Sequence, residues 1–348
     1  MKKKGLLFVL VMMVVTVGIV LSACAGGPVV YVYNWGEYID PDVLKQFTAE
    51  TGIKVKYSTF ETNEDMYIKI TSGRAKYDVI VPSDYMIDKL IKEELLQPLN
   101  YENIPNAQYI DPAYKSLAHD PDDIYSIPYI WGTLGIVYNT KMVNEPVDSW
   151  SILWDEKYKG NILMLDSIRD SFAVVQSLLG QSINSSDATE LAAVKAKLLE
   201  LKPLVRAWLV DKVISDMEAN EAAIAVTWSC DFLQMQQRNN DLAYVIPKEG
   251  SNLWLDSMAI PKNAVNVSAA EQFINFMCRE DIALANSEFL QNPTPQVQAK
   301  ALQGEELRDN PAAYPSAQEL ERCEVFLHLG EDVLKAYDRI WTEIGIGQ

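Results

Sequence analysis

Aromatic side chains set beside carboxylates are the residues of this 348-residue chain whose types and spacing suggest chemistry. Trp35, Glu37 and Tyr38 place an indole, a carboxylate and a phenol within four residues, at the end of an alternating run typical of a strand. Aromatic faces attract ammonium groups by ~0.5–2 kcal/mol each. A carboxylate supplies the charge-assisted hydrogen bond without which an ammonium is costly to bury. Taken alone, this segment is equally consistent with a cation-binding site and with a strand end that carries exposed aromatic residues.

The same pairing of rings with acids recurs at other predicted strand ends, and these residues are Asp84, Tyr85, Asp170, Trp228, Trp254 and Asp256. In open α/β sheets, ligands bind beyond the carboxyl ends of the strands. We therefore expect the rings and acids to line one cleft that suits an elongated polycation. A sugar also stacks on tryptophan and stays an alternative ligand, although a sugar does not require several converging acids.

Signals for an enzyme are mostly absent from the sequence. The two histidines, His119 and His328, have no partner at metal-ligand spacing, and the usual phosphate-loop, dinucleotide and nucleophile-elbow motifs do not occur. Asp166 and Asp170 stand four apart and could form the carboxylate pair of a surface-anchored hydrolase, which is a remote alternative because we favour a binding role for Asp170. We predict no catalytic residues, no metal site and no cofactor.

The first residues have the layout of a secretory leader, with a basic segment at 2–4, an apolar run at 6–21 and small residues before Cys24. The order Leu-Ser-Ala-Cys resembles a bacterial lipobox, in which the cysteine is acylated and becomes the new N-terminus. An ordinary signal peptide with a chance cysteine is the alternative. We predict a lipoprotein signal peptide at 1–23 and a lipidated linker at 24–28. The protein is then extracytoplasmic and contacts the membrane through lipidated Cys24.

The charge and the remaining cysteines exclude other classes of protein. The formal net charge is -18, which repels nucleic acid, so we expect no nucleic-acid partner. Cys230, Cys278 and Cys323 are an odd number and form no C-x-x-C motif. They can form at most one disulfide among themselves, and the sequence does not identify the pair.

Strands and helices alternate along two stretches, from 29 to 93 and from 150 to 254. This pattern predicts two α/β domains with parallel, doubly covered sheets, and the chain length suits two domains. Apolar strands at 127–139 and 254–261 are the predicted crossings between the domains. A chain that crosses twice has a natural hinge. After the second crossing, apolar residues at helical spacing predict one long helix at 268–289.

Several segments together resemble one protein family, and they lie at 33–38, 47–55, 77–83, 125–132, 254–261 and 293–295. Over nearly the whole mature chain they resemble the bacterial spermidine/putrescine-binding proteins that serve polyamine ABC transporters. The resemblance implies a type II, periplasmic-binding-protein-like fold, in which two doubly wound α/β lobes joined by a hinge close on the ligand. We place the first lobe at 29–133 and 257–300, and the second lobe at 134–256 and 301–348.

The resemblance also implies roles for individual residues. Trp35 and Tyr38 become walls for a methylene chain, with Glu37 near an amine. Ser83 and Tyr85 match the family's binding loop. The remaining matches are Trp228 and Trp254 as stacking residues, Asp256 as the main amine acceptor, and Asp170 where the family has a glutamate.

Three positions depart from the better-known spermidine binders. Ser167 stands where they have an acid, Asn292 replaces an aromatic before Pro-Thr-Pro, and Phe326 stands where a glutamine contacts the ligand. The choice between putrescine and spermidine therefore stays open. We predict a monomeric solute-binding protein that captures a polyamine and hands it to the permease of an ABC importer. The same fold binding another organic cation or a sugar is the alternative.

Overall fold

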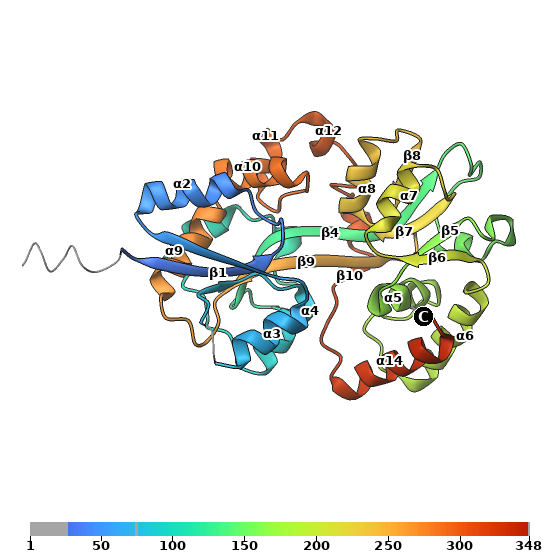
Figure 1. Ribbon diagram of the computed structural model, residues 1–348, viewed down its shortest axis with the longest axis horizontal. Helices are drawn as coiled ribbons and strands as arrows, with labels where there is room; N and C mark the ends of the chain where they lie inside the picture. The colour runs from blue at the N-terminus through green and yellow to red at the C-terminus, as the bar shows by residue number, and fades with distance from the viewer. Residues whose placement is uncertain (1–26, 74–75, 347–348) are drawn as a thin grey trace, which may run out of the picture.

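The computed structural model describes residues 27–73 and 76–346. The predicted signal peptide and Cys24 lie outside the described residues. Figure 1 shows two α/β lobes side by side, joined by long strands that cross the middle of the molecule. In the part of the chain that the structure describes, no helix is both long and apolar enough to cross a membrane.

Parallel strands form the sheet of the first lobe. β1 (Val29–Trp35) lies between β2 (Lys54–Phe60) and β3 (Val79–Ile80) and pairs with both in parallel. Figure 1 shows helices on both faces of this sheet, as the alternating pattern predicted. The helices of this lobe are α2 (Pro41–Thr51), α3 (Asn63–Thr71), α4 (Asp84–Lys92), α9 (Val267–Met277) and α10 (Glu280–Leu290).

Helix α2 shows how the local sequence places these elements. The Asp40 carboxylate accepts the Asp42 N–H at 2.8 Å, and Pro41 occupies the first turn. Gly52 ends the helix in the left-handed conformation, with φ of 73°, which costs a glycine little. Both ends of this helix could be predicted from the sequence.

Parallel strands also form the sheet of the second lobe. β5 (Ile162–Leu165) lies between β6 (Val205–Leu209) and β7 (Ile224–Trp228). The remaining strand, β8 (Leu242–Val245), is antiparallel to its neighbour. The helices of this lobe are α5 (Ile168–Leu178), α6 (Ala188–Leu201), α7 (Lys212–Glu218), α8 (Ser229–Gln236) and the C-terminal α14 (Glu331–Ile344).

Two long antiparallel strands, β4 (Ser126–Asn139) and β9 (Ser251–Ala259), connect the lobes. β4 pairs with β9 over 126–133 and with β7 over 134–138, so the two lobe sheets merge into one mixed sheet. The short β10 (Cys323–Glu324) pairs with the start of β9. Other short elements are α11 (Val297–Leu302), α12 (Glu305–Arg308), α13 (Ala317–Leu320) and 3-10 turns at Pro105–Tyr109, Pro112–Tyr114, Trp150–Trp154 and Glu156–Tyr158.

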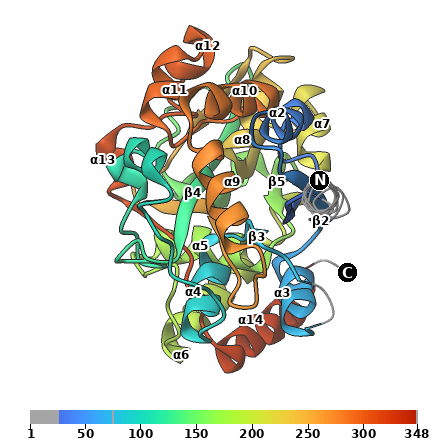
Figure 2. The ribbon, with the colours of Figure 1, turned by 90° about the vertical axis from the view of Figure 1, so that its left-hand side faces the viewer.

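Each lobe buries its own aromatic core. In the first lobe, the Phe47 ring of α2 lies 5.2 Å from the rings of Phe273 and Phe276 in α9. In the second lobe, Phe172 of α5 stacks at 4.4 Å on Tyr337 of α14. Figure 2 shows α14 at the bottom of the molecule, away from the first-lobe helix α2 near the upper right. Because each lobe has its own core, it can keep its shape while the connecting strands bend.

One predicted helix is wrong. The apolar periodicity of 268–289 predicts a single helix, but α9 ends at Met277 and α10 begins at Glu280. Arg279 between them has extended backbone, with ψ of 147°, and its guanidinium binds Glu50 of α2 as well as the nearby Asp281. The periodicity of apolar residues within one segment cannot predict a salt bridge to a distant helix. β6 and α7 have no counterpart among the predicted elements.

The cysteines of the described residues, Cys230, Cys278 and Cys323, are free thiols. Cys278 is buried at the C-cap of α9. Cys230 stands in the first turn of α8 and Cys323 in β10.

Candidate ligand-binding site

Two tryptophans and an aspartate reach one face of the sheet where the lobes meet. Trp254 pairs with Gly132 of β4, and Trp228 pairs with Leu134, two residues further along the same strand. Paired residues in antiparallel strands point to one face, and so do residues two apart in one strand. Asp256 follows Trp254 by two residues and shares that face. The register therefore brings together side chains from the end of β7 and from the interior of β9, so the prediction that Trp254 and Asp256 stand at a strand end is wrong.

Gly132 makes room for the Trp254 indole. A Cβ atom on Gly132 would lie 2.4 Å from Cζ2 of Trp254 and 2.7 Å from Oγ of Ser229. Contacts this short do not persist in proteins, so any larger residue must displace the indole or the hydroxyl. A glycine inside a long strand is the sequence signal for such a close approach, and Gly132 was not predicted as a site residue.

The Asp256 carboxylate is the centre of the first-lobe side of the site. Its Oδ1 accepts the Ser83 hydroxyl at 2.7 Å, and its Oδ2 accepts the Tyr38 hydroxyl at 2.7 Å. Burial raises the pKa of Asp256 to about 6, against the smaller opposing effect of these two donors. At neutral pH the group is a buried carboxylate with no cation paired to it among the described residues, which is the environment that favours binding an ammonium.

Asn63 holds Ser83 and Tyr85 at the start of α4. Its Nδ2 donates to the Ser83 hydroxyl at 3.1 Å and to the Tyr85 hydroxyl at 3.0 Å, and its Oδ1 accepts the Ser83 N–H at 3.2 Å. The Tyr85 hydroxyl in turn donates to Glu64 at 3.1 Å. Asn63 is buried at the start of α3 and was not predicted from the sequence, because its partners lie 20 residues or more away.

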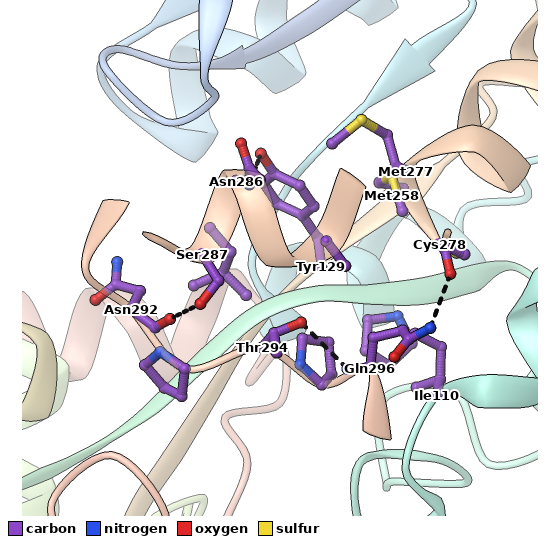
Figure 3. Close-up of a pocket in the computed structure, with 15 residues that line it drawn as sticks. Ile110, Tyr129, Met258, Met277, Cys278, Asn286, Ser287, Asn292, Thr294 and Gln296 are labelled. Carbon is purple, nitrogen blue, oxygen red and sulfur yellow. Dashed lines mark hydrogen bonds between the residues drawn. The ribbon is translucent and has the colours of Figure 1, made fainter. Parts of the chain in front are cut away.

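A second buried chain of hydrogen bonds fixes Tyr38. The Tyr129 hydroxyl donates to the Tyr38 carbonyl at 2.6 Å, and Asn286 Nδ2 donates to the Tyr129 hydroxyl at 2.9 Å. Figure 3 shows Tyr129 and Asn286 together beside a cavity of about 20 Å³. Asn292 lines this cavity, which is too small for a polyamine. The structure therefore places Asn292 at a small cavity beside Tyr129.

The second-lobe side of the site is built around Asp170. Its Oδ2 accepts the Ser167 hydroxyl at 2.5 Å, and its Oδ1 accepts the Trp228 indole N–H at 3.3 Å. Burial raises the pKa of Asp170, and the two donors oppose that shift. Ser167 therefore serves as a hydrogen-bond donor to Asp170 at the N-cap of α5.

Trp35 and Glu37 lie at the end of β1 but join neither carboxylate through a described hydrogen bond. The Trp35 ring packs on Phe60 with centroids 4.5 Å apart. Glu37 is exposed and has a left-handed backbone, with φ of 49°. Among the described residues, three indole N–H groups are buried without an acceptor, those of Trp35, Trp131 and Trp254.

Phe326 lies where the two lobes touch. Its ring packs with Ala173 and Ile183 of the second lobe and with Tyr85 of the first. The Arg169 guanidinium lies 4.3 Å from the centre of the Phe326 ring. Of the three departures noted in the sequence, Ser167 and Phe326 thus contact predicted site residues directly, and Asn292 does not share their surroundings.

Comparison with known proteins identifies the family. Residues 42–315 match the bacterial extracellular solute-binding proteins. The chain belongs to this family. A spermidine/putrescine-binding periplasmic protein of Escherichia coli (strain K12) is 38% identical over 296 residues, which cover 84% of this chain and 85% of that protein.

Solved structures agree with this family and with the two-lobed fold. A spermidine/putrescine ABC transporter substrate-binding protein from Streptococcus pneumoniae has 41% identity and a TM-score of 0.85, covering 91% of this chain and 98% of its own. A lipoprotein of Treponema pallidum has 26% identity and a TM-score of 0.81, covering 91% and 99%. The predicted two-lobed α/β fold is confirmed.

The family also decides against an enzyme, because these relatives are substrate-binding proteins of transport systems. The geometry agrees for the two acids that could have formed a hydrolytic pair. Asp166 is exposed, whereas Asp170 is buried against Ser167 and Trp228.

Proposed function

We propose that this solute-binding protein captures a polyamine, putrescine or spermidine, between its lobes outside the cytoplasm and delivers it to an ABC importer. The observation that carries the proposal is the Asp256 carboxylate, which is buried between two hydroxyl donors and has no cation paired to it among the described residues. It shares a face of β9 with Trp254. A buried carboxylate without a cation is stabilised when a ligand ammonium group pairs with it, because the ion pair offsets the cost of burying the negative charge. The names of the relatives support a polyamine as the source of that ammonium.

The proposed roles follow from where each side chain lies. Asp256, which is held by the first-lobe hydroxyls of Tyr38 and Ser83, and Asp170 of the second lobe accept the ammonium groups. Ser83 and Ser167 orient these carboxylates by donating to them. The remaining proposed contacts are Trp35, Tyr38, Tyr85, Trp228 and Trp254 along the methylene chain, with Glu37 near an amine at the exposed end of β1.

Calorimetric titration of the mature protein with putrescine, spermidine and spermine tests the proposal. We expect heat and a rise in melting temperature with at least one of them, and no detectable binding in Asp256→Asn. Small-angle scattering is expected to show a more compact particle when the ligand is present, because ligand contacts from both lobes favour closure. No heat and no thermal shift with any of the three would contradict the proposal.

A different ligand in the same fold, such as a sugar or another organic cation, is the second candidate. The observation that favours a sugar is the pair of buried indole N–H groups of Trp35 and Trp254, because a hydroxyl oxygen can accept from them and an ammonium cannot. Binding that survives the loss of both Asp256 and Glu37 would support this candidate.

The lipid anchor, the monomeric state and the lobe boundaries complete the proposal. Acylation of Cys24 is supported by the lipobox-like residues and by the lipoprotein among the relatives. Labelled palmitate is expected to enter the wild-type protein and to be absent from Cys24→Ala. The separate lobe cores support lobes at 29–133 with 257–300 and at 134–256 with 301–348. Light scattering of the mature protein is expected to give the mass of one chain.

A further inference from the structure

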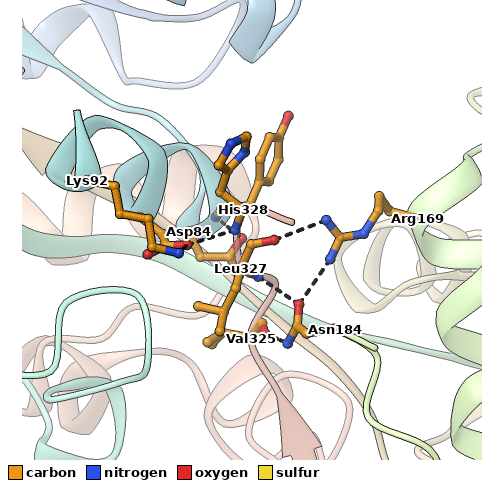
Figure 4. A network of polar contacts seen from close by, with 9 residues as sticks. Asp84, Lys92, Arg169, Asn184, Val325, Leu327 and His328 are labelled. Atoms are coloured by element: carbon orange, nitrogen blue, oxygen red, sulfur yellow. Dashed lines mark hydrogen bonds and ion pairs between the residues drawn. The ribbon is translucent and has the colours of Figure 1, made fainter. Parts of the chain in front are cut away.

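An extended segment passes between the lobes beside the candidate site, and we call residues 325–328 the strap. The strap leaves β10 and leads to α14. Figure 4 shows it running between α4 of the first lobe and the Arg169 side chain of the second. Both ends of the strap belong to the proposed second lobe, so the strap adds a contact between the lobes to the connections made by β4 and β9.

The first lobe holds the strap through two carboxylates of α4. Asp84 Oδ2 accepts the Phe326 N–H at 3.2 Å, and Asp88 Oδ2 accepts the His328 N–H at 2.8 Å. Asp84 is 1% exposed and Asp88 is 6% exposed, so both bonds are shielded from water. Burial raises the pKa of Asp84, and the backbone N–H groups of Tyr85 and Phe326 oppose that shift by binding the carboxylate form.

The second lobe holds the alternate residues of the strap. Asn184 Nδ2 donates to the Val325 carbonyl at 2.9 Å, and Asn184 Oδ1 accepts the Leu327 N–H at 2.8 Å. Arg169 donates to the Leu327 carbonyl at 3.1 Å and to Asn184 at 3.0 Å. An extended chain turns successive backbone groups to opposite sides, so each lobe binds its own side of the strap.

Asp84 connects the strap to the candidate site. Its Oδ1 accepts the N–H of Tyr85 at 2.7 Å, while its Oδ2 holds Phe326. The residue before it, Ser83, donates to Asp256. On the other side of the strap, Arg169 precedes Asp170 in α5. One carboxylate therefore fixes the spacing between Tyr85 in the first turn of α4 and the Phe326 ring that packs on it.

We infer that Asp84 is a positioning residue of the ligand site, which sets how closely the two lobes approach at the Tyr85–Phe326 end. The inference rests on the proposed function, because its consequence is the length of the ligand that fits. While Asp84 holds the strap, Phe326 closes that end of the site against Tyr85. When Asp84 releases the strap, Phe326 can move outward, and a short diamine loses more contacts than a longer triamine.

Two asparagine substitutions separate this role from a general loss of charge. In Asp84→Asn, a single amide oxygen cannot accept both the Tyr85 and the Phe326 N–H groups, so the amide NH₂ faces one of these donors. In Asp88→Asn, one oxygen can keep the position of Oδ2, which already accepts both His328 and Lys92. Asp88→Asn therefore removes a charge from the same helix and leaves the strap attached.

The test measures putrescine and spermidine affinity by calorimetry, and amide exchange at single-residue resolution, in the mature protein. In Asp84→Asn we expect Phe326 amide exchange to speed up at least tenfold, putrescine affinity to fall about tenfold, and spermidine affinity to fall threefold or less. In Asp88→Asn we expect both affinities to stay within twofold of wild type. In the wild type, putrescine is expected to slow the exchange of the Phe326 amide, a measurement that needs no variant.

Three results would overturn the inference. One is an Asp84→Asn protein with faster Phe326 exchange and an unchanged ratio of the two affinities. Another is a wild-type Phe326 amide whose exchange does not respond to putrescine. The third is a wild-type protein that binds neither polyamine. This result would overturn the proposed function as well, which distinguishes it from the first two.

Discussion

The two buried acids of the site, Asp256 and Asp170, have similar surroundings but are assembled in different ways. The donors to Asp256 are Ser83 and Tyr38, which stand 173 and 218 residues away in the chain. The hydroxyl donor to Asp170 is Ser167, three residues away in the turn that begins α5. The Asp256 group thus forms only when the first lobe is folded, while half of the Asp170 group is local.

This difference predicts unequal contributions to binding. The loops that carry the Asp256 donors are held in turn by Asn63 and Tyr129, so these hydroxyls are already oriented when the ligand arrives. Oriented groups lose less entropy on binding. We therefore expect Asp256 to contribute more to affinity than Asp170.

The largest expected effect is the loss of binding in Asp256→Asn. Removing one partner of a buried charge pair costs roughly 2–5 kcal/mol, so we expect the dissociation constant for the best polyamine to rise at least about 100-fold. Calorimetry measures this change, and circular dichroism checks that the fold is retained. A variant that binds within threefold of wild type would remove Asp256 from the site.

The same substitution is expected to stabilise the ligand-free protein at neutral pH. Because the folded-state pKa of Asp256 is raised to about 6, the folded state holds a proton that the unfolded state has released between about pH 4 and pH 6. This group's contribution to stability therefore falls as the pH rises through that window. We expect the free energy of unfolding of Asp256→Asn to exceed that of wild type by about 1–3 kcal/mol at pH 7.5.

The advantage of Asp256→Asn is expected to shrink as the pH falls toward 4, where the wild-type carboxyl is protonated as well. Urea unfolding at several pH values measures it. A difference in stability between the two proteins that does not depend on pH would argue against an ionised, unpaired Asp256.

A smaller loss of affinity is expected for Asp170→Asn, about tenfold for the best polyamine. The remaining donors, Ser167 and Trp228, can shift to bind the new amide oxygen, because one of them is in the same helical turn. Asp166→Asn is the matched control, since this neighbour is exposed, and it should bind as wild type does. An Asp170→Asn loss as large as that of Asp256→Asn would break the contrast between the two acids.

The smallest effect is expected for Gly132→Ala, a three- to tenfold loss of affinity. The added methyl group displaces the Trp254 indole next to Asp256. Gly135→Ala is the control, because its methyl group would lie 2.4 Å from the Tyr244 ring and strain the same strand three residues further on. If both variants lose affinity equally, the cause is strain in β4 and not the position of Trp254.

The contrast between the acids also shows what the sequence can predict. Trp228, Trp254 and Asp256 were predicted because rings and acids stood together at expected strand ends. Trp254 and Asp256 lie inside β9 instead, but the fold does bring all three to one face. These side chains share one face because of the way β4 pairs with β7 and β9. That pairing register cannot be predicted from the residue spacing within any one segment.

Other parts of the site could not be found from local patterns. Asn63 and Tyr129 act on loops distant in the chain, so no spacing signals them. The broken helix at Arg279 has the same cause, since Glu50 on another helix binds its side chain. Ser167 was recognised as a departure from the family. Its hydrogen bond to Asp170 could not be predicted, because it depends on where α5 begins.

The central claim is that Asp256 accepts an ammonium group, and the most direct test is the number of protons released on binding. Calorimetric titration with putrescine at pH 6, repeated in buffers of different ionisation enthalpy, gives this number. Since the pKa of Asp256 is about 6 in the ligand-free protein, we predict a release of about half a proton in wild type. Asp170→Asn is expected to keep most of this release if it binds. Binding by wild type with no release of protons at pH 6 would contradict the account.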